Sequence, residues 1–465
     1  MIEPHMLTGS EALPLLRTGQ LTVEGLARSC LKRVAERDFS VRAWSYLDPD
    51  AVLAEARRLD REERKGPLHG IPIGVKDVIL TKNMPTQQNS PIYADDSPRI
   101  DAACIQTLRA AGALIFGKTV TTEFAATASG GPTRNPHDLA RTPGGSSSGS
   151  GAAVADFHVP ITLATQTGGS TIRPASYNGI SALKPTWNAI NREGLKIFVP
   201  STDTLGFCAR SIQDLELLAD VFQLEDCVPT KRIELSDARV GLYQGPAWDR
   251  AEDATRAAMN LGAALLRDAG AHVDELTLPS AFDDVLTQFG IILAGEARTS
   301  FLHEALMHPD ILRDEFMAFV DDRNTVSRRD LVDAYDKVAS LRRIFDERAG
   351  AFDAVLTPSV PGEAPPGIDR TGDPVFNSMW TVLHTPVVNI PGFSGPNGLP
   401  VGLSLVSPRY TDRQLLAISA EVTDLFVAKG GWRLDADKRR ESAAAQRGAL
   451  VDQSMPVRDS CVRRY

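Results

Sequence analysis

Two glycine-flanked serine clusters lie within the segment 142–173, which reads TPGGSSSGSGAAVADFHVPITLATQTGGSTIR. The first cluster begins at Ser146 and the second contains Ser170, while upstream Lys76 lies in the apolar run IPIGVKDVI. Nucleophilic attack on a carbonyl needs a hydroxyl, a group that takes its proton, and N–H donors for the oxyanion. The segment and Lys76 supply such groups without a histidine, which points to amide hydrolysis.

Lys76 is a base at neutral pH only if its pKa lies well below the ordinary value of about 10.4. Burial lowers the pKa of a lysine, in extreme cases by about 3–5 units. Apolar side chains flank this lysine and provide such a setting: Ile71, Ile73, Val75, Val78 and Ile79. The alternative is a lysine at a strand end that pairs with Asp77 or another carboxylate. Spacing alone does not connect Lys76 with the serines.

The second cluster, Thr167-Gly168-Gly169-Ser170, follows an apolar run that is typical of a strand. Glycines allow a sharp turn in which consecutive N–H groups converge on one point beside the serine hydroxyl. A tetrahedral intermediate needs such donors. The alternative is an ordinary Gly-Gly turn whose serine caps the next helix. These residues alone leave both interpretations open.

Four other patterns match known motifs in the wrong context. GALIFGKT (112–119) should follow a strand and open a helix to bind phosphate, but its interior is predicted to be a strand. GSSSG (145–149) lacks the preceding strand of a hydrolase elbow, although histidines follow it and keep that mechanism open. SALK (181–184) has no partner motif, and HEALMH (303–308) has one residue too many for a zinc-binding helix.

Hydrophobic periodicity predicts the elements that must position these groups. Helices are expected at 21–37, 50–65, 102–111, 149–156, 211–223 and 251–269, with a mostly helical, charged region at 282–350. Strands are expected at 71–76, 113–116, 161–166, 240–243, 355–357, 387–390 and 401–406. This alternation predicts an α/β sheet with helices on its faces. Lys76 then ends one strand, and Ser170 follows another.

Composition excludes several classes of protein. The 465 residues are 43% hydrophobic with a net charge of −9, which fits a large core and gives no nucleic-acid footprint. Five scattered cysteines without a CxxC pair favour a reducing compartment over a disulfide framework or a zinc site. We see no signal peptide and no apolar run near the roughly 20 residues that span a membrane. A cytoplasmic protein is therefore expected.

Three regions are expected along the chain. Residues 1–65 form an N-terminal helical segment that packs on the core, and residues 66–429 form the catalytic domain. Residues 430–465 include DADKRRESAAAQRGAL, which has little apolar periodicity. We expect a flexible tail there, because disorder concentrates at termini, with a partner-binding helix as the alternative.

Longer motifs resemble the amidase signature family. The glycine- and serine-rich signature matches PGGSSSGSGAAVA followed by TQTGGSTIRPAS, and LHGIPIGVKD matches the lysine segment. GPTRNP, ALKPTW, PSTDTLGFCARSIQDLELLADVF, LTPSVPG, NIPG and GLPVGLSLVSPRYTDRQLL also match, so the similarity spans about 66–416. The resemblance implies a single large domain with a central mixed β-sheet covered by helices on both faces.

The resemblance also implies roles for individual residues. Ser170 would be the nucleophile, Lys76 the ultimate base and Ser146 the bridge that carries the proton between them. The peptide Gly145–Ser146 would be cis. The oxyanion would be received by the backbone N–H groups of Thr167, Gly168, Gly169 and Ser170. No metal or organic cofactor is implied.

One departure from the common pattern concerns the substrate. Many relatives have Asp at Gln166 and an arginine two residues after the nucleophile, whereas Arg173 stands three residues after Ser170. This variant resembles a malonamidase-like branch, in which the equivalent arginine binds the carboxylate of the substrate. A guanidinium suits a carboxylate bidentately. The alternative is that Arg173 bonds the backbone or an internal acid.

The activity implied is hydrolysis of a small carboxylic amide to an acid and ammonia or amine. An A-type subunit of a tRNA-dependent amidotransferase is the main alternative, although the net charge and the Gln166/Arg173 variant argue mildly against it. A lipid amide hydrolase and a non-enzymatic binding member are the others. The expected partner is a small-molecule amide, with no nucleic acid and no membrane, and a homodimer stays open. The substrate pocket is expected mainly from residues 285–385.

Overall fold

The computed structural model describes residues 3–63, 66–94, 96–231, 233–321, 323 and 325–434. One compact unit ends at Arg433 and contains both the N-terminal segment and the catalytic region expected from the sequence. The N-terminal segment is anchored to helix α7 (Ile212–Val221), because the Asp214 carboxylate accepts the N–H groups of Gly9 and Ser10 at the start of helix α1 (Gly9–Thr18). From residue 435 onward, the predicted tail lies outside the described residues.

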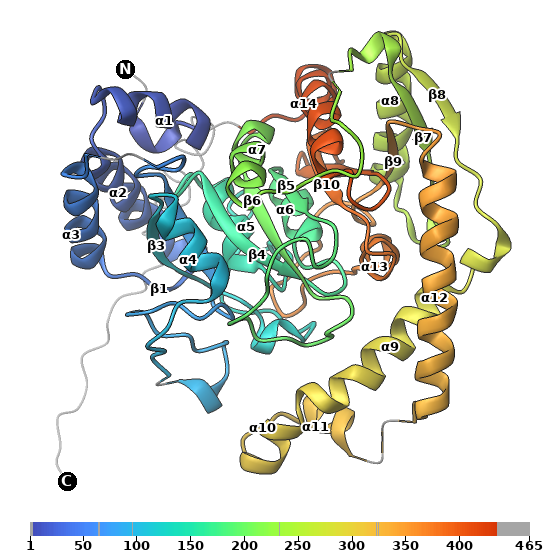
Figure 1. Cartoon of the computed structure of the whole chain (residues 1–465), viewed down its shortest axis with the longest axis horizontal. Helices are drawn as coiled ribbons and strands as arrows, with labels where there is room; N and C mark the ends of the chain where they lie inside the picture. Colours follow the sequence, from blue (N-terminus) through green and yellow to red (C-terminus); the bar gives the residue numbers. More distant parts are fainter. Residues whose placement is uncertain are drawn as a thin grey trace, which may run out of the picture. The chain divides into compact units, whose positions relative to one another are not determined.

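A mixed sheet of eleven strands runs through this unit in the order β1-β3-β2-β4-β6-β5-β10-β11-β9-β7-β8 (Figure 1). β2 pairs in parallel with β3 and β4, and β7 pairs in parallel with β8 and β9, whereas the other pairs are antiparallel. The strands are β1 Trp44–Tyr46, β2 Pro72–Lys76, β3 Leu114–Thr119, β4 Ile161–Gln166, β5 Ser181–Lys184, β6 Thr204–Ala209, β7 Arg239–Leu242, β8 His272–Glu275, β9 Ala354–Pro358, β10 Val387–Ser394 and β11 Pro400–Val406. The mixed α/β sheet predicted from the motifs is confirmed.

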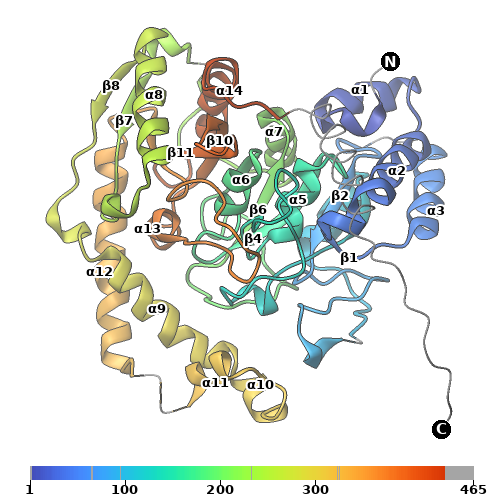
Figure 2. The same ribbon diagram turned by 180° about the vertical axis from the view of Figure 1, so that it is seen from behind.

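Helices cover both faces of the sheet, as the views from opposite sides show (Figures 1 and 2). They are α1 Gly9–Thr18, α2 Val23–Val41, α3 Pro49–Asp60, α4 Ala103–Ala110, α5 Ser148–Ala155, α6 Ile172–Asn178, α7 Ile212–Val221, α8 Asp253–Asp268, α9 Val285–Ser300, α10 Leu302–Met307, α11 Asp314–Val320, α12 Arg328–Ala349, α13 Val375–Val382 and α14 Asp412–Lys429. The predicted helices are confirmed with end shifts of a few residues. The charged region is resolved into four helices, α9 to α12.

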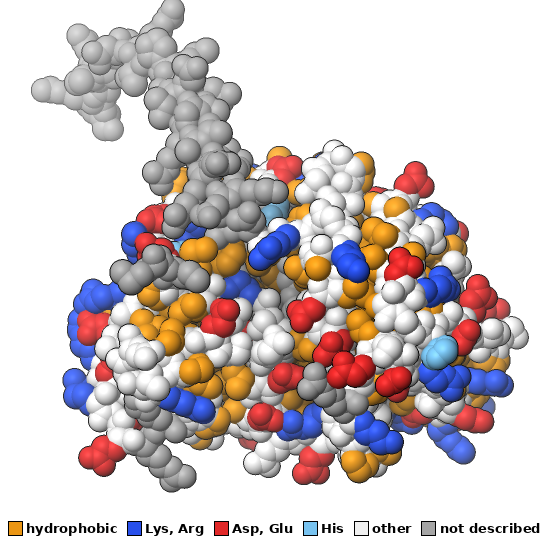
Figure 3. Space-filling view, turned by 90° about the horizontal axis from the view of Figure 1, so that it is seen from above, with side chains coloured by type: hydrophobic (Ala, Val, Ile, Leu, Met, Phe, Trp, Pro, Cys, Tyr) orange, Lys and Arg blue, Asp and Glu red, His pale blue; other side chains and the backbone are white. Residues whose placement is uncertain are grey.

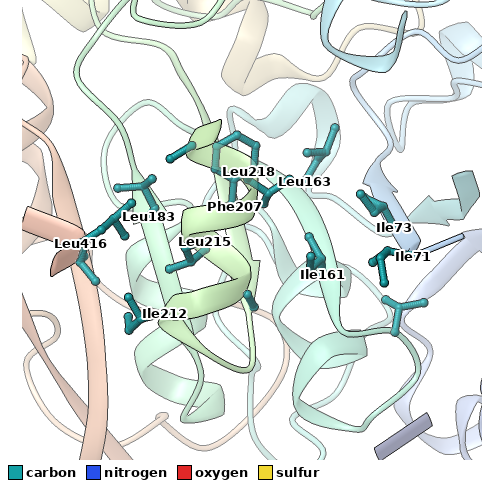
Figure 4. Close-up of a cluster of buried hydrophobic side chains, with 14 of the residues drawn as sticks. Ile71, Ile73, Ile161, Leu163, Leu183, Phe207, Ile212, Leu215, Leu218 and Leu416 are labelled. Atoms are coloured by element: carbon teal, nitrogen blue, oxygen red, sulfur yellow. The ribbon is translucent and has the colours of Figure 1, made fainter. Parts of the chain in front are cut away.

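The alternation of side chains along β4 places helices on opposite faces. Ile161 and Leu163 point toward α7, whose Ile212, Leu215 and Leu218 pack over the sheet (Figure 4). Thr162 points the other way, and its hydroxyl donates to the carbonyl of Ser150 in α5 at 3.1 Å. Because successive strand residues face opposite sides, α5 lies on the face away from α7.

Two further observations concern the charges on one face of the protein and the length of its helices. On the face seen from above, acidic and basic side chains are intermixed, with no broad patch of one sign (Figure 3). Among the described residues, no helix is long and apolar enough to cross a membrane.

Candidate active site

Lys76 and Ser170 reach the same edge of the sheet because their strands are parallel neighbours. Lys76 is the last residue of β2, and β4 ends at Gln166, four residues before Ser170. The carboxyl ends of adjacent parallel strands meet at one edge of a sheet. Ser170 is buried to 8% exposure, and Lys76 is fully buried.

The ammonium-bearing end of Lys76 contacts the first serine cluster. Nζ lies 2.7 Å from the Ser146 hydroxyl and 2.7 Å from the Thr165 hydroxyl. Burial lowers the pKa of Lys76 to about 7, although the nearby Asp203 carboxylate opposes this shift. Among the described residues no carboxylate is hydrogen-bonded to this lysine, and a pKa near 7 gives it a substantial neutral fraction at neutral pH.

Asp77 does not pair with Lys76, which settles the alternative that the sequence left open. Its carboxylate faces the other way and forms a buried ion pair with Lys118 at 3.2 Å. Lys118 also donates to the Ile79 carbonyl at 2.8 Å and the Thr86 hydroxyl at 2.6 Å. Since Lys118 belongs to the GKT of the phosphate-loop pattern and lies in strand β3, that pattern has a structural role.

Replacing Lys118 by methionine is expected to destabilise the fold by about 3–5 kcal/mol, because it leaves the Asp77 carboxylate buried without its partner. Chemical denaturation at pH 7 measures the change in the free energy of unfolding. The double variant Lys118→Met/Asp77→Asn is the control and should recover part of the loss. A single variant as stable as the wild type would contradict this interpretation of the pair.

The loop before α5 carries Ser146, and its peptide Gly145–Ser146 is cis, as the resemblance implied. The Ser146 carbonyl accepts the N–H groups of Thr122 at 3.2 Å and Ser148 at 2.9 Å. Gly144 has φ +83°, and a Cβ there would approach the Cα of Pro174 to 2.9 Å. The loop is therefore held against α6, and only glycine fits at that contact.

Arg173 supports this loop from α6. Its Nη2 donates to the Gly145 carbonyl at 2.6 Å and to the Thr371 hydroxyl at 3.2 Å, and Nη1 donates to the Gly372 carbonyl at 3.1 Å. The side chain is buried, and its Nε has no partner among the described residues. This is the backbone-bonding alternative of the sequence analysis. Carboxylate binding by Arg173 stays a prediction.

In the described loop 167–171, N–H groups are left without a protein acceptor, whereas carbonyls accept hydrogen bonds. The Gly169 carbonyl accepts the Arg173 N–H at 2.9 Å, and the Ser170 carbonyl accepts the Ser147 N–H at 3.3 Å. Within the described part of the chain, no protein group accepts the N–H groups of Gly168, Gly169 or Ser170. Free donors beside a serine are what an oxyanion needs.

Thr167, the first residue of the loop, is tied to Asp203. Its hydroxyl donates to the Asp203 carboxylate at 2.5 Å, and the same carboxylate accepts the N–H groups of Phe198 at 2.6 Å and Val199 at 3.2 Å. Burial raises the pKa of Asp203 to about 6, against the lowering effect of these hydrogen bonds. The segment that contains Asp203 thus fixes one end of the loop.

The competing serine and lysine patterns are used for structure. The Ser147 hydroxyl donates to the Thr165 carbonyl at 3.2 Å, and no strand precedes this serine, so the hydrolase-elbow pattern does not apply. Lys184 of the SALK pattern lies in strand β5 and donates to the Pro185 carbonyl at 2.9 Å. In the described structure, neither side chain is hydrogen-bonded to Lys76 or Ser146, although Lys76 Nζ also approaches the Thr165 carbonyl, at 3.4 Å.

A cavity of about 810 Å³ approaches the glycine loop through Pro374, although Lys76, Ser146 and Ser170 are not among its lining residues. Pro374 lines it, and the Cβ of this proline lies 3.1 Å from where a Cβ on Gly169 would be. Much of the wall comes from 361–374, within the region expected to build the substrate pocket. Charged side chains of both signs line the cavity: Arg250, Glu252, Glu363, Asp369, Arg370 and Asp373.

Comparison with known proteins identifies the family of this chain. The family described as Amidase matches residues 25–416. The chain therefore belongs to the amidase signature family, and it is an enzyme of the class that acts on C–N bonds.

Individual relatives cover nearly the whole chain. The A-type subunit of glutamyl-tRNA(Gln) amidotransferase from Chloroflexus aggregans is 34% identical over 90% of this chain and 96% of that protein. The protein of the same name from Acidothermus cellulolyticus is 32% identical over 95% and 98%. A solved structure described as an amidase has a TM-score of 0.82 and 29% identity, covering 90% of this chain and 100% of its own.

Proposed function

We propose that this protein cleaves a carboxylic amide through an acyl-enzyme on Ser170, with Lys76 as base and Ser146 as proton relay. The contact of Lys76 Nζ with the Ser146 hydroxyl carries the proposal, because it joins a buried lysine with a pKa near 7 to a serine of the signature segment. General bases work best when their pKa lies near the operating pH.

Lys76 Nζ donates to the Ser146 hydroxyl and to the hydroxyl and carbonyl of Thr165 in the structure, and it acts as a base once it loses one proton. Its single lone pair would accept the Ser146 proton, while its N–H groups donate to Thr165. Ser146 would then take the proton of Ser170 as the latter attacks the amide carbonyl. The N–H groups of Thr167, Gly168, Gly169 and Ser170 are the proposed oxyanion donors. The same relay returns a proton to the leaving amine, and water releases the acid.

A small carboxylic amide with water as the acyl acceptor is the first candidate reaction. It is supported by the Gln166/Arg173 variant and by the similarity to a solved amidase at 29% identity. The second candidate is the A-type component of a tRNA-dependent amidotransferase, which releases ammonia from an amide for a partner protein. The sequence relatives support this second candidate more directly, since both of those described above carry that name.

Ammonia release by the purified full chain separates the two candidates. We expect turnover of simple carboxamides without any partner. The panel is benzamide, glutamine, and malonic acid monoamide beside malonic acid monoamide methyl ester. Activity confined to glutamine and dependent on added partner proteins would instead support the amidotransferase.

The malonyl pair also tests Arg173. If its guanidinium binds a carboxylate, the free acid should be hydrolysed at least about 10-fold faster than its methyl ester, as expected for a charge-assisted bidentate contact. Equal kcat/KM values for the two amides would leave Arg173 with the structural contacts to Gly145, Thr371 and Gly372.

A further inference from the structure

Gln166 and Thr381 form a hydrogen-bonded chain behind the glycine loop. The Gln166 Nε2 donates to the Thr381 hydroxyl at 3.0 Å, and this hydroxyl donates to the Gly168 carbonyl at 2.8 Å. Gln166 Oε1 accepts the N–H groups of Thr171 at 3.0 Å and Ile172 at 3.1 Å. Both side chains are fully buried, and Thr381 comes from α13, more than 200 residues away in the chain.

The direction of every bond in this chain follows from the backbone. The N–H groups of Thr171 and Ile172 only donate, so the side-chain atom of Gln166 that faces them must be its oxygen. Its NH₂ group therefore faces Thr381, whose hydroxyl oxygen accepts. The one hydroxyl proton of Thr381 is then free for a carbonyl. The Gly168 carbonyl lies at 2.8 Å and is closer than the other possible acceptor, the backbone carbonyl of Asn377 at 3.3 Å.

The hydrogen bond from Thr381 to the Gly168 carbonyl also fixes the direction of the next N–H group, that of Gly169. A trans peptide is planar, and its N–H points opposite to its C=O. The hydroxyl of Thr381, which holds the Gly168 carbonyl, therefore directs the N–H of Gly169 away from itself. Glycines on both sides of this peptide would otherwise let it rotate at little cost.

We propose that Gln166 and Thr381 are positioning residues that orient the Gly168–Gly169 peptide, so that the Gly169 N–H receives the oxyanion. This inference rests on the proposed acyl-enzyme chemistry at Ser170. It also gives a physical reason for glutamine at position 166. A carboxylate in the same place has no donor for Thr381, so the threonine proton turns to it and leaves Gly168.

A rhodamine-linked fluorophosphonate tests the proposal without knowledge of the natural substrate. The Ser170 Oγ–P bond forms, the P–F bond breaks, fluoride leaves, and the serine proton passes to the base. The phosphonyl oxygen of the probe needs the same N–H donors as the oxyanion of a tetrahedral intermediate. The second-order labelling rate constant is measured for the full-length chain, together with the thermal unfolding midpoint of each variant.

Thr381→Val keeps the shape of the side chain and removes the hydroxyl. We expect about 10- to 100-fold slower labelling, somewhat less than the loss of an oxyanion donor itself. Thr381→Ser keeps the hydroxyl and should label at nearly the wild-type rate. Gln166→Glu, which keeps the shape but removes the donor, should resemble Thr381→Val.

Thr385→Val is the matched control, because among the described residues this buried hydroxyl bonds the Trp380 carbonyl alone, at 3.1 Å, and not the glycine loop. Its labelling rate should match the wild type even if its unfolding midpoint falls. The proposal is overturned if Thr381→Val labels at the wild-type rate, or if Thr385→Val slows equally. Wild-type protein that labels no faster than Ser170→Ala overturns the proposed function itself.

Discussion

Ser170→Ala is expected to lower amide turnover by about 10⁴- to 10⁶-fold, because it removes the nucleophile of the proposed acyl-enzyme. Donors of the loop and substrate binding would still supply a small residual rate. Steady-state ammonia release measures the loss, and mass spectrometry of the intact protein after fluorophosphonate treatment should show no adduct. The wild type should gain the mass of one phosphonyl group.

A matched control for this substitution is Ser148→Ala. Ser148 is also buried in the signature segment, but its hydroxyl donates to the Val120 carbonyl at 3.3 Å and not to the Lys76–Ser146 pair. It should keep wild-type labelling. If Ser170→Ala retained full turnover, the acyl-enzyme would have to form elsewhere and the proposed function would be wrong.

Local patterns predicted the elements around the site well. The strand expected at 161–166 is β4 Ile161–Gln166, and the strand ending at Lys76 is β2 Pro72–Lys76. Both are short apolar runs bounded by glycine, proline or polar residues, so their signal is contained in the segment itself. The apolar neighbours of Lys76 in the sequence indicate that its strand is buried, but Ile73 and Val75 face the opposite side of the sheet, and the end of the Lys76 side chain contacts Ser146 and Thr165.

Two elements without a clear sequence pattern were not predicted, helix α6 and strand β6. Helix α6 Ile172–Asn178 begins in a glycine-rich loop and contains Pro174, and its first N–H groups are satisfied by Gln166 instead of a local cap. Strand β6 Thr204–Ala209 is buried on both faces, so it shows no alternation of polar and apolar residues. Neither has a strong local pattern.

The partners of the candidate residues could not be read from spacing either. Asp77 is adjacent to Lys76 in the sequence, but it lies in the turn after β2, and its carboxylate meets Lys118 instead. Thr381 and Asp203 reach the glycine loop from α13 and from the segment before β6. Only the tertiary fold brings these groups together, since none belongs to the signature segment 142–173.

Lys76→Met is expected to lower kcat/KM by about 10²- to 10⁴-fold at neutral pH, the usual contribution of a general base. In the wild type the base is active only when neutral. Because the pKa of Lys76 is about 7, kcat/KM should rise with pH through about 7 and then level off. The variant should lose this ascending limb, which measurements of ammonia release from pH 5 to 9 would reveal.

Stability separates this catalytic role from a structural one. The pKa of Lys76 is lower in the folded state than its ordinary value of about 10.4, so between about 7 and 10 the unfolded chain binds a proton that the folded chain does not. The wild type should therefore gain stability relative to Lys76→Met as pH rises through this window, with a slope of up to about 1.4 kcal/mol per pH unit.

Near pH 6 the wild type carries a buried charge that destabilises its folded state and that the methionine variant lacks. A variant that is inactive yet at least as stable as the wild type at pH 6 supports Lys76 as the base. Full activity, or an unchanged ascending limb, would assign the proton transfer to another group.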